Sequence, residues 1–420
     1  MSQTPLQRGI RDTAFLFSGN AISAAISFVI TIYIARSLSL SDFGSYITII
    51  AFVTFFSIFT DWGINAAIIS EGQKKPEDTY KLIFSSMGLK LLMSLATMFA
   101  VILFALITPY SLEVKALIIL MSVTLVMGGV GSLFSAVLNI YRDLKYISII
   151  QIVERITFAS LAFIFLLAGL GITGVIIAII IAAFASLILN FILSRRIDDY
   201  KLNFKPIFDR AILTKAVWIG ILVELETVWY SLSAAMLSGL TNTTQVGLYA
   251  PALSYVGIGD LAVIALMSAF SPIVSRAASD RRISKKELIK YVGYIAVAGL
   301  VTVGITYAFG GQLMIFAFGP KFAESIVLIN ILTIGFAVSL ITIPTSLLLN
   351  ATNFQRVNIL PALFLMWIGV PLNLYLIPRM GALGAAYATM ILQSVVALLS
   401  ISTALYVLKG SKYFYQPPTA

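Results

Sequence analysis

The sequence predicts an all-α integral membrane protein, with twelve transmembrane helices in two parallel six-helix repeats around a central cavity. Apolar residues make up 60% of its 420 residues and charged residues only 11%, whereas a soluble domain carries about 25% charged residues. The apolar residues form long runs, and landmarks of the first half of the chain return in the second half. Composition, run length and internal repetition therefore indicate the same architecture.

Twelve runs are long enough to cross a bilayer, because a helix needs about 20 mostly apolar residues to span the hydrocarbon core. The first run has no small-residue cleavage pattern after it, so we expect it to remain as a helix and not to be removed as a signal peptide. The outer connections are short, and the longest is expected at 310–323. The predicted spans are residues 14–34, 44–68, 82–108, 115–139, 147–169, 173–193, 215–238, 246–270, 289–310, 324–349, 357–377 and 382–408.

Three landmarks recur at offsets of 203, 211 and 210 residues. Each lies at the end of an apolar run, so the repeated unit is a bundle of membrane helices. Six spans per half is an even number, which gives parallel repeats related by an axis along the membrane normal. We expect one lobe over residues 1–205 and a second over 206–420. The landmark pairs are Gly44-Ser45-Tyr46 with Gly247-Leu248-Tyr249, Leu138-Asn139 with Leu349-Asn350, and Gly171-Ile172-Thr173-Gly174 with Gly381-Ala382-Leu383-Gly384.

The distribution of Lys and Arg predicts the orientation in the membrane. Of 28 such residues, 22 lie on the termini and on the connections from even to odd spans. Positive residues mark the cytoplasmic side, so both termini are expected in the cytoplasm. The net charge of +10 therefore reports topology and contact with anionic lipid heads, and nucleic acid is not expected as a partner.

Missing residue types exclude several functions. The chain contains no cysteine and no histidine, which rules out thiolate nucleophiles, Cys-zinc sites, iron–sulfur clusters and Ser-His triads. It also lacks a G-x-x-x-x-G-K-[ST] phosphate loop, so ATP is not expected to drive it. With short outer loops as well, we expect no enzymatic activity and no cofactor beyond coupling to H⁺ or Na⁺.

Seven ionisable residues fall inside predicted spans, where a central charge costs roughly 2.5–3.5 kcal/mol. Such residues line a polar pathway or pair with one another, and both interpretations stay open. Lys90 could pair with Glu154, and Arg155 with another carboxylate. Residues one or two positions apart point in different directions on a helix. We therefore expect one of Glu154/Arg155 and one of Glu224/Glu226 in the pathway. The seven are Asp61, Lys90, Glu154, Arg155, Glu224, Glu226 and Asp260.

The segment from Leu16 to Ser70 resembles the polysaccharide-flippase family. The first span ends in Tyr33-Ile34-Ala35-Arg36, and Ser41-Asp42-Phe43-Gly44-Ser45-Tyr46 follows. Asp61-Trp62-Gly63 follows after 14 intervening residues. These stretches are similar to the family's glycine-x-tyrosine and aspartate-x-glycine motifs. The wider superfamily includes drug/cation antiporters and lipid II flippases.

The resemblance implies a flippase that moves an undecaprenyl-diphosphate-linked oligosaccharide, such as an O-antigen unit for lipopolysaccharide, across the bacterial inner membrane. It assigns Lys90 and Arg155 to the diphosphate. Expected partners are this lipid-linked substrate, membrane lipids and polysaccharide polymerase or assembly proteins. A cation-coupled multidrug antiporter remains the alternative, and a membrane-bound polymerase or ligase is disfavoured by the short outer loops. The acidic residues Asp61, Glu154, Glu224, Glu226 and Asp260 are expected to contact sugar or a coupling ion.

Overall fold

The computed structural model describes residues 5–197, 233–257, 285–351 and 359–410, together with residues 213, 214, 216, 259 and 263. The chain divides into two compact units, Met1–Ser231 and Leu232–Ala420, and each is described by itself. The boundary predicted between residues 205 and 206 lies outside the described residues and stays a prediction.

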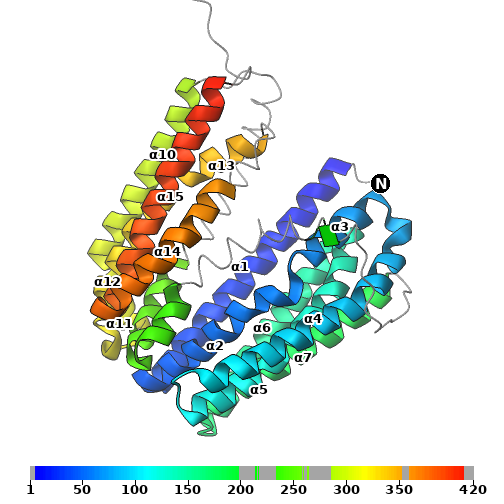
Figure 1. The fold of residues 1–420 in the computed structure, drawn as a ribbon, viewed down its shortest axis with the longest axis horizontal. Helices are drawn as coiled ribbons and strands as arrows, with labels where there is room; N and C mark the ends of the chain where they lie inside the picture. The colour runs from blue at the N-terminus through cyan, green and yellow to red at the C-terminus, as the bar shows by residue number, and fades with distance from the viewer. Residues whose placement is uncertain are drawn as a thin grey trace, which may run out of the picture. The chain divides into compact units, whose positions relative to one another are not determined.

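The first unit is a bundle of long helices (Figure 1). Helix α7 packs against α5 and α6, α4 packs against α5, and α1 packs against α6. The short 3-10 helix Pro76–Asp78 joins α3 to α4. The helices are α1 (Pro5–Ser37), α2 (Leu40–Asp61), α3 (Ile64–Lys74), α4 (Thr79–Ile107), α5 (Leu112–Ile140), α6 (Leu144–Leu167) and α7 (Gly171–Arg195).

The second unit repeats the packing of its last helix. Helix α15 packs against α12 and α14, as α7 does against α5 and α6. Residues 233–240 and 243–257 are also helical. The named elements are α10 (Lys285–Ile305), a π-helical turn (Thr306–Gly310), α11 (Gly311–Phe318), a 3-10 turn (Pro320–Phe322), α12 (Ser325–Ser339), α13 (Thr342–Ala351), α14 (Ile359–Met380) and α15 (Ala382–Gly410).

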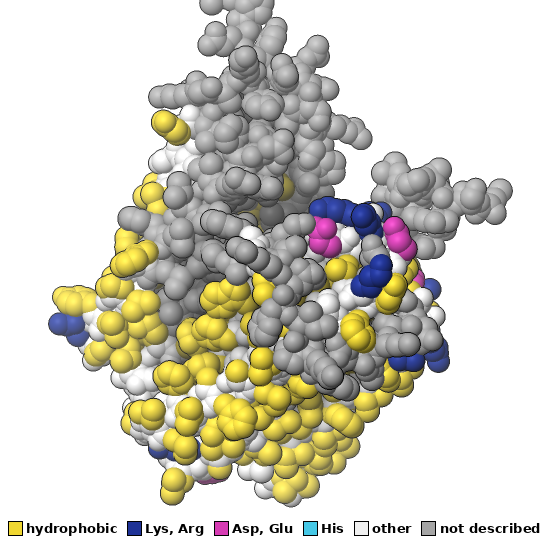
Figure 2. Space-filling view, turned by 45° about the vertical axis from the view of Figure 1, so that its right-hand side comes forward, with side chains coloured by type: hydrophobic (Ala, Val, Ile, Leu, Met, Phe, Trp, Pro, Cys, Tyr) yellow, Lys and Arg dark blue, Asp and Glu magenta, His cyan; other side chains and the backbone are white. Residues whose placement is uncertain are grey.

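The described part of the chain is helical and fits a multi-pass membrane protein. Nine stretches within it are long and apolar enough to cross a bilayer. Large apolar side chains such as Phe99, Leu103 and Ile107 on α4 are exposed, and Figure 2 shows hydrophobic side chains over much of the described surface. Such exposure suits a surface that faces lipid, since hydrocarbon solvates apolar groups and helices satisfy their own backbone.

Serine hydroxyls fix the start of two membrane helices. Ser39 accepts a hydrogen bond from the backbone N–H of Asp42 at 3.0 Å and begins α2. Ser111 accepts from the N–H of Val114 at 3.4 Å and begins α5. Each bond satisfies one of the N–H groups that a helix leaves open in its first turn.

Two predicted spans and one predicted loop differ from the observed structure. The second span, expected as one helix over 44–68, is divided into α2 and α3. The tenth, expected over 324–349, is divided into α12 and α13, with Pro344 in the first turn of α13, where proline is tolerated. The outer loop expected at 310–323 is wrong over most of its length, because a π-helical turn carries the helix on to Phe318.

Glycines explain why one landmark recurs. Gly171 is the first residue of α7 and Gly381 directly precedes α15, with φ of 55° and 58°, a conformation that costs other residues roughly 1–2 kcal/mol. Three residues later, a Cβ on Gly174 would lie 2.8 Å from the Cβ of Phe165, and one on Gly384 would overlap the Leu376 carbonyl. The two units therefore repeat a left-handed turn followed by close packing.

The two turn glycines give a matched pair of substitutions. A Cβ on Gly171 would meet open space, whereas one on Gly381 would lie 2.5 Å from Oε1 of Gln245. We expect Gly171→Ala to lower the stability by about 1–2 kcal/mol through strain alone. Gly381→Ala should lower it further, because Gln245 also loses its bond from the Ala382 N–H, which is 2.8 Å long. Thermal unfolding of the purified variants in detergent checks the order, and equal melting temperatures would contradict it.

Candidate functional site

A break in the second membrane span positions the first group of predicted site residues. Trp62 and Gly63 have φ of 44° and 77°, so neither continues the helix. The Trp62 N–H still donates to Ile58 as the last bond of α2. One carboxylate oxygen of Asp61 then accepts the N–H of Asn65 at 3.1 Å. Asp61, the last residue of α2, thus satisfies an N–H group in the first turn of α3, two residues before its N-cap Gly63.

The same carboxylate oxygen pairs with a buried ammonium. Nζ of Lys90 on α4 donates to Oδ1 of Asp61. The side chain of Lys90 is 0% exposed and that of Asp61 is 25% exposed. Taking an unpaired charge out of water costs several kcal/mol, so the pair makes the burial of Lys90 tolerable and holds α4 against the break.

Small residues allow the helices to approach closely beside this pair. Ser94 lies one turn beyond Lys90 on α4 and is fully buried. A Cβ on Gly129 of α5 would overlap the Ser94 hydroxyl and lie 3.6 Å from the Cβ of Thr60 on α2. Close approach through glycine and serine is the usual way in which membrane helices associate, so α2, α4 and α5 meet around the ion pair.

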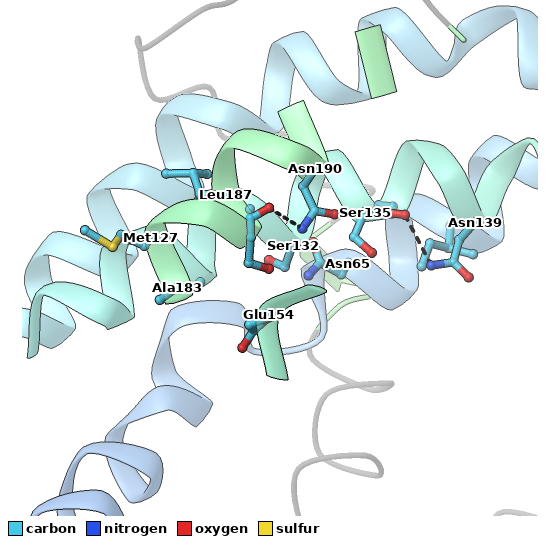
Figure 3. A pocket seen from close by; sticks show the side chains of 14 residues that line it. Asn65, Met127, Ser132, Ser135, Asn139, Glu154, Ala183, Leu187 and Asn190 are labelled. Carbon is cyan, nitrogen blue, oxygen red and sulfur yellow. Dashed lines mark hydrogen bonds between the residues drawn. The ribbon is translucent and has the colours of Figure 1, made fainter. Parts of the chain in front are cut away.

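A cavity of about 350 Å³ lies within the first unit. It is formed by residues of α3, α5, α6 and α7, and Figure 3 shows their side chains. Glu154 enters from α6 and is the one acidic residue among the described lining residues. The lining residues are Asn65, Ile69, Met127, Gly128, Gly131, Ser132, Ser135, Ala136, Asn139, Glu154, Ala183, Ser186, Leu187 and Asn190.

Backbone carbonyls hold several polar side chains of the lining in place. Oγ of Ser132 donates to the carbonyl of Gly129 at 2.7 Å. The side-chain amides of Asn139 and Asn190 donate to carbonyls one turn earlier, at 3.2 and 2.9 Å, as the dashed lines in Figure 3 mark. Oδ1 of Asn65 is buried and has no hydrogen-bond partner among the described residues.

The structure separates the predicted site residues of the first half into three settings. Glu154 lines the cavity. The neighbouring Arg155 is exposed and is not among the lining residues. Lys90 and Asp61 form the buried pair, so the expected pairing of Lys90 with Glu154 is wrong: the helix break brings Asp61 to Lys90 instead. Whether Lys90 and Arg155 meet a diphosphate stays a prediction.

The acidic residues predicted in the second half cannot be placed. Glu224, Glu226 and Asp260 lie outside the described residues. Within the part that the structure describes, no group of three or more His, Cys, Asp or Glu side chains could hold a metal ion. The role in sugar contact or ion coupling assigned to these three residues and to Asp61 remains a prediction.

The sequence-based prediction of the site considered only ionisable residues and did not include the Ser and Asn residues that line the cavity. Ser132, Ser135 and Asn139 are spaced three and four residues apart on α5, and Ser186 and Asn190 are four apart on α7. This spacing places side chains on one face of a helix. A search for neutral polar residues at helical spacing within apolar runs would have found both groups.

The ion pair gives a stability prediction. Asp61→Asn removes the charge that Asp61 places beside the buried ammonium of Lys90 and should cost about 3–5 kcal/mol. Lys90→Met should cost less, because the carboxylate of Asp61 is partly exposed. The double variant should regain part of the loss, since the buried ammonium that needs the carboxylate is then gone. Thermal unfolding in detergent measures all three.

An exposed pair on the neighbouring helix is the control. Lys74 and Glu71 on α3 are 2.9 Å apart with side chains 63% and 28% exposed, and Lys74→Met should change stability by less than about 1 kcal/mol. A double variant at positions 61 and 90 that is as unstable as the sum of its single variants would contradict a coupled pair.

The fold is shared with solved transporter structures. The chain is similar to the lipid II flippase MurJ in an inward closed conformation, with a TM-score of 0.72, 15% identity and 95% and 88% of the two chains covered. It is similar to an inward-facing multidrug resistance MATE family transporter of the MOP superfamily, with a TM-score of 0.69, 14% identity and 93% and 96% covered. It is also similar to a MOP superfamily transporter from Pyrococcus furiosus, with a TM-score of 0.61, 14% identity and 96% and 97% of the two chains covered.

Identities this low show a common fold alone. The comparison with curated proteins gives no match. A family model described as "Polysaccharide biosynthesis protein" matches residues 10–278, which is more than half of the 420 residues. This match confirms the resemblance carried by the motifs around Gly44 and Asp61, and the chain belongs to the polysaccharide biosynthesis protein family.

Proposed function

We propose that this protein is a flippase for an undecaprenyl-diphosphate-linked oligosaccharide, such as an O-antigen or similar surface polysaccharide unit. The observation that carries the proposal is a polar cavity inside a bundle of membrane helices, in a chain of the polysaccharide biosynthesis family. The fold shared with a lipid II flippase supports the same class of cargo.

The chemistry of such a cargo explains the need for polar groups at membrane depth. A prenyl tail can stay in lipid, whereas sugars and a diphosphate lose their water when they enter hydrocarbon. An unpaired polar group in an apolar environment costs several kcal/mol. Asn, Ser and Glu side chains inside the bundle replace part of that water, and movement of the cargo between leaflets then follows by alternating access.

Of the two cations assigned to the diphosphate, Arg155 is the better placed. Its side chain is exposed, and a guanidinium can bind phosphate oxygens through two parallel N–H groups. Lys90 is enclosed and bonded to Asp61, so it would first have to leave its carboxylate. Within this proposal Arg155 contacts the cargo, and Lys90 acts mainly through the ion pair.

The proposal includes a location and a direction. The protein lies in the bacterial inner membrane with both termini in the cytoplasm, and it moves cargo from the cytoplasmic to the periplasmic leaflet. H⁺ or Na⁺ supplies the driving force, without a further cofactor or an enzymatic step. Polysaccharide polymerase and assembly proteins are the proposed partners on the periplasmic side.

A cation-coupled multidrug antiporter is the second candidate. The fold shared with MATE family transporters favours it, and so does Glu154, which presents a carboxylate to the cavity. The two candidates differ in cargo: a drug cation would be attracted by this carboxylate, and a diphosphate would be repelled by it.

A deletion strain separates the two functions. We expect loss of surface polysaccharide and unchanged drug sensitivity, and restoration by a plasmid copy of the gene. Arg155→Gln should restore about tenfold less polysaccharide than the unmodified gene, because a hydrogen bond to a charged group contributes about 1.5–3 kcal/mol. Immunoblotting of surface polysaccharide and drug inhibition assays are the measurements.

Lys145→Gln is the matched control, since Lys145 is another exposed cation of α6. It should restore polysaccharide fully. Intact surface polysaccharide in the deletion strain, together with raised drug sensitivity, would favour the antiporter. Equal effects of the two substitutions would exclude a specific role for Arg155.

A further inference from the structure

Three side chains of the cavity lining have more acceptors than donors left for a guest. The hydroxyl proton of Ser132 is used on a helix carbonyl, and Asn139 and Asn190 each use one amide N–H in the same way. These side chains keep their oxygen lone pairs, and each of the two amides keeps one N–H. Most of the capacity that remains on these three side chains therefore accepts hydrogen bonds.

Two further groups add acceptors. The side chain of Asn65 lines the cavity and carries one acceptor oxygen and two N–H donors; its Oδ1 is enclosed and unpaired among the described residues. The carboxylate of Glu154 supplies two more oxygens when ionised. A buried acceptor without a donor is unfavourable, so the lining favours a guest that brings several O–H or N–H groups.

The charge of the lining disfavours an anion. None of the 14 described lining residues is Lys or Arg, whereas Glu154 is acidic. A diphosphate offers acceptor oxygens and negative charge, and it would face other acceptors and a carboxylate. Electrostatic interactions are strong where water is excluded, so this cavity is a poor place for that part of the cargo.

The volume favours a sugar over a bare cation. The cavity of about 350 Å³ lies at the lower end of the range for small-molecule sites, roughly 300–1,000 Å³. At about 30 Å³ per water it has room for roughly ten waters. A single cation would leave most of that volume and most of the acceptors unused, whereas a ring with several hydroxyl groups would engage them.

We infer that the cavity between α3, α5, α6 and α7 is a subsite for the hydroxyl-bearing sugars of the cargo and excludes its diphosphate. Ser132 and Glu154 accept hydrogen bonds from sugar hydroxyls there, and the side-chain amide of Asn65 forms a further hydrogen bond. This inference rests on the proposed flippase function, and it separates the sugar-binding groups from Arg155, the exposed cation next to Glu154 on α6.

Two lipids test the assignment with the purified full-length protein in nanodiscs. One is undecaprenyl diphosphate, and the other is undecaprenyl diphosphate linked to N-acetylglucosamine. Native mass spectrometry titrations should show tighter binding of the sugar-bearing lipid. Asn65→Leu and Glu154→Gln should each weaken that binding by about tenfold, because each removes an acceptor or its charge. Binding of the lipid without sugar should not weaken.

A matched pair of serines on α5 controls for folding. Ser132 and Ser122 both donate to a carbonyl three residues earlier, at 2.7 and 2.6 Å, but Ser122 does not line the cavity. Ser132→Ala should weaken binding of the sugar-bearing lipid by about threefold, and Ser122→Ala should leave it unchanged. Thermal unfolding of each variant checks that the protein is intact.

The outcomes separate the subsite from the flippase. Equal weakening of both lipids by the cavity variants, no weakening by any of them, or equal binding of both lipids to the unmodified protein would overturn the sugar subsite and leave the flippase proposal standing. Saturable binding of neither lipid to the unmodified protein would overturn the proposed function, and the subsite with it.

Discussion

The contact between Lys90 and Asp61 is the interaction on which the described part of the first unit depends most. A bilayer offers no water to backbone groups, so an interrupted helix needs partners of its own at the interruption. One oxygen of Asp61 receives both the ammonium of Lys90 and the N–H of Asn65. The same atom therefore fixes the packing of α4 and the start of α3.

The ion pair is connected to the cavity through Asn65. Its backbone N–H is bonded to Asp61, and its side chain lines the cavity two turns or more from the C-terminal end of α3 at Lys74. A change at the break would move this side chain, because α3 begins there. Buried ion pairs add little net stability. The position that the Asp61–Lys90 pair gives to Asn65 therefore explains its presence better than stability alone.

The shared fold does not by itself decide what this protein does. The lipid II flippase and the MATE transporter share this fold with the chain at 14–15% identity, and one fold can carry several functions. In the first unit the groups with different chemistry are separated: an enclosed ion pair, an exposed arginine and a cavity rich in acceptors. The proposed cargo has a charged diphosphate and neutral sugars, and separate groups of this kind could bind the two parts.

The sequence by itself determined the membrane class, the approximate spans of the described helices and the recurrence of the glycine landmarks at Gly171 and Gly381. These follow from run length and from local backbone conformation, which neighbouring residues report. Only the tertiary structure decided that Lys90 meets Asp61, 29 residues away, and that Glu154 shares a cavity with asparagines and serines of three other helices. Those contacts depend on the rotation of each helix about its axis and on a helix break, and uniformly apolar runs specify neither.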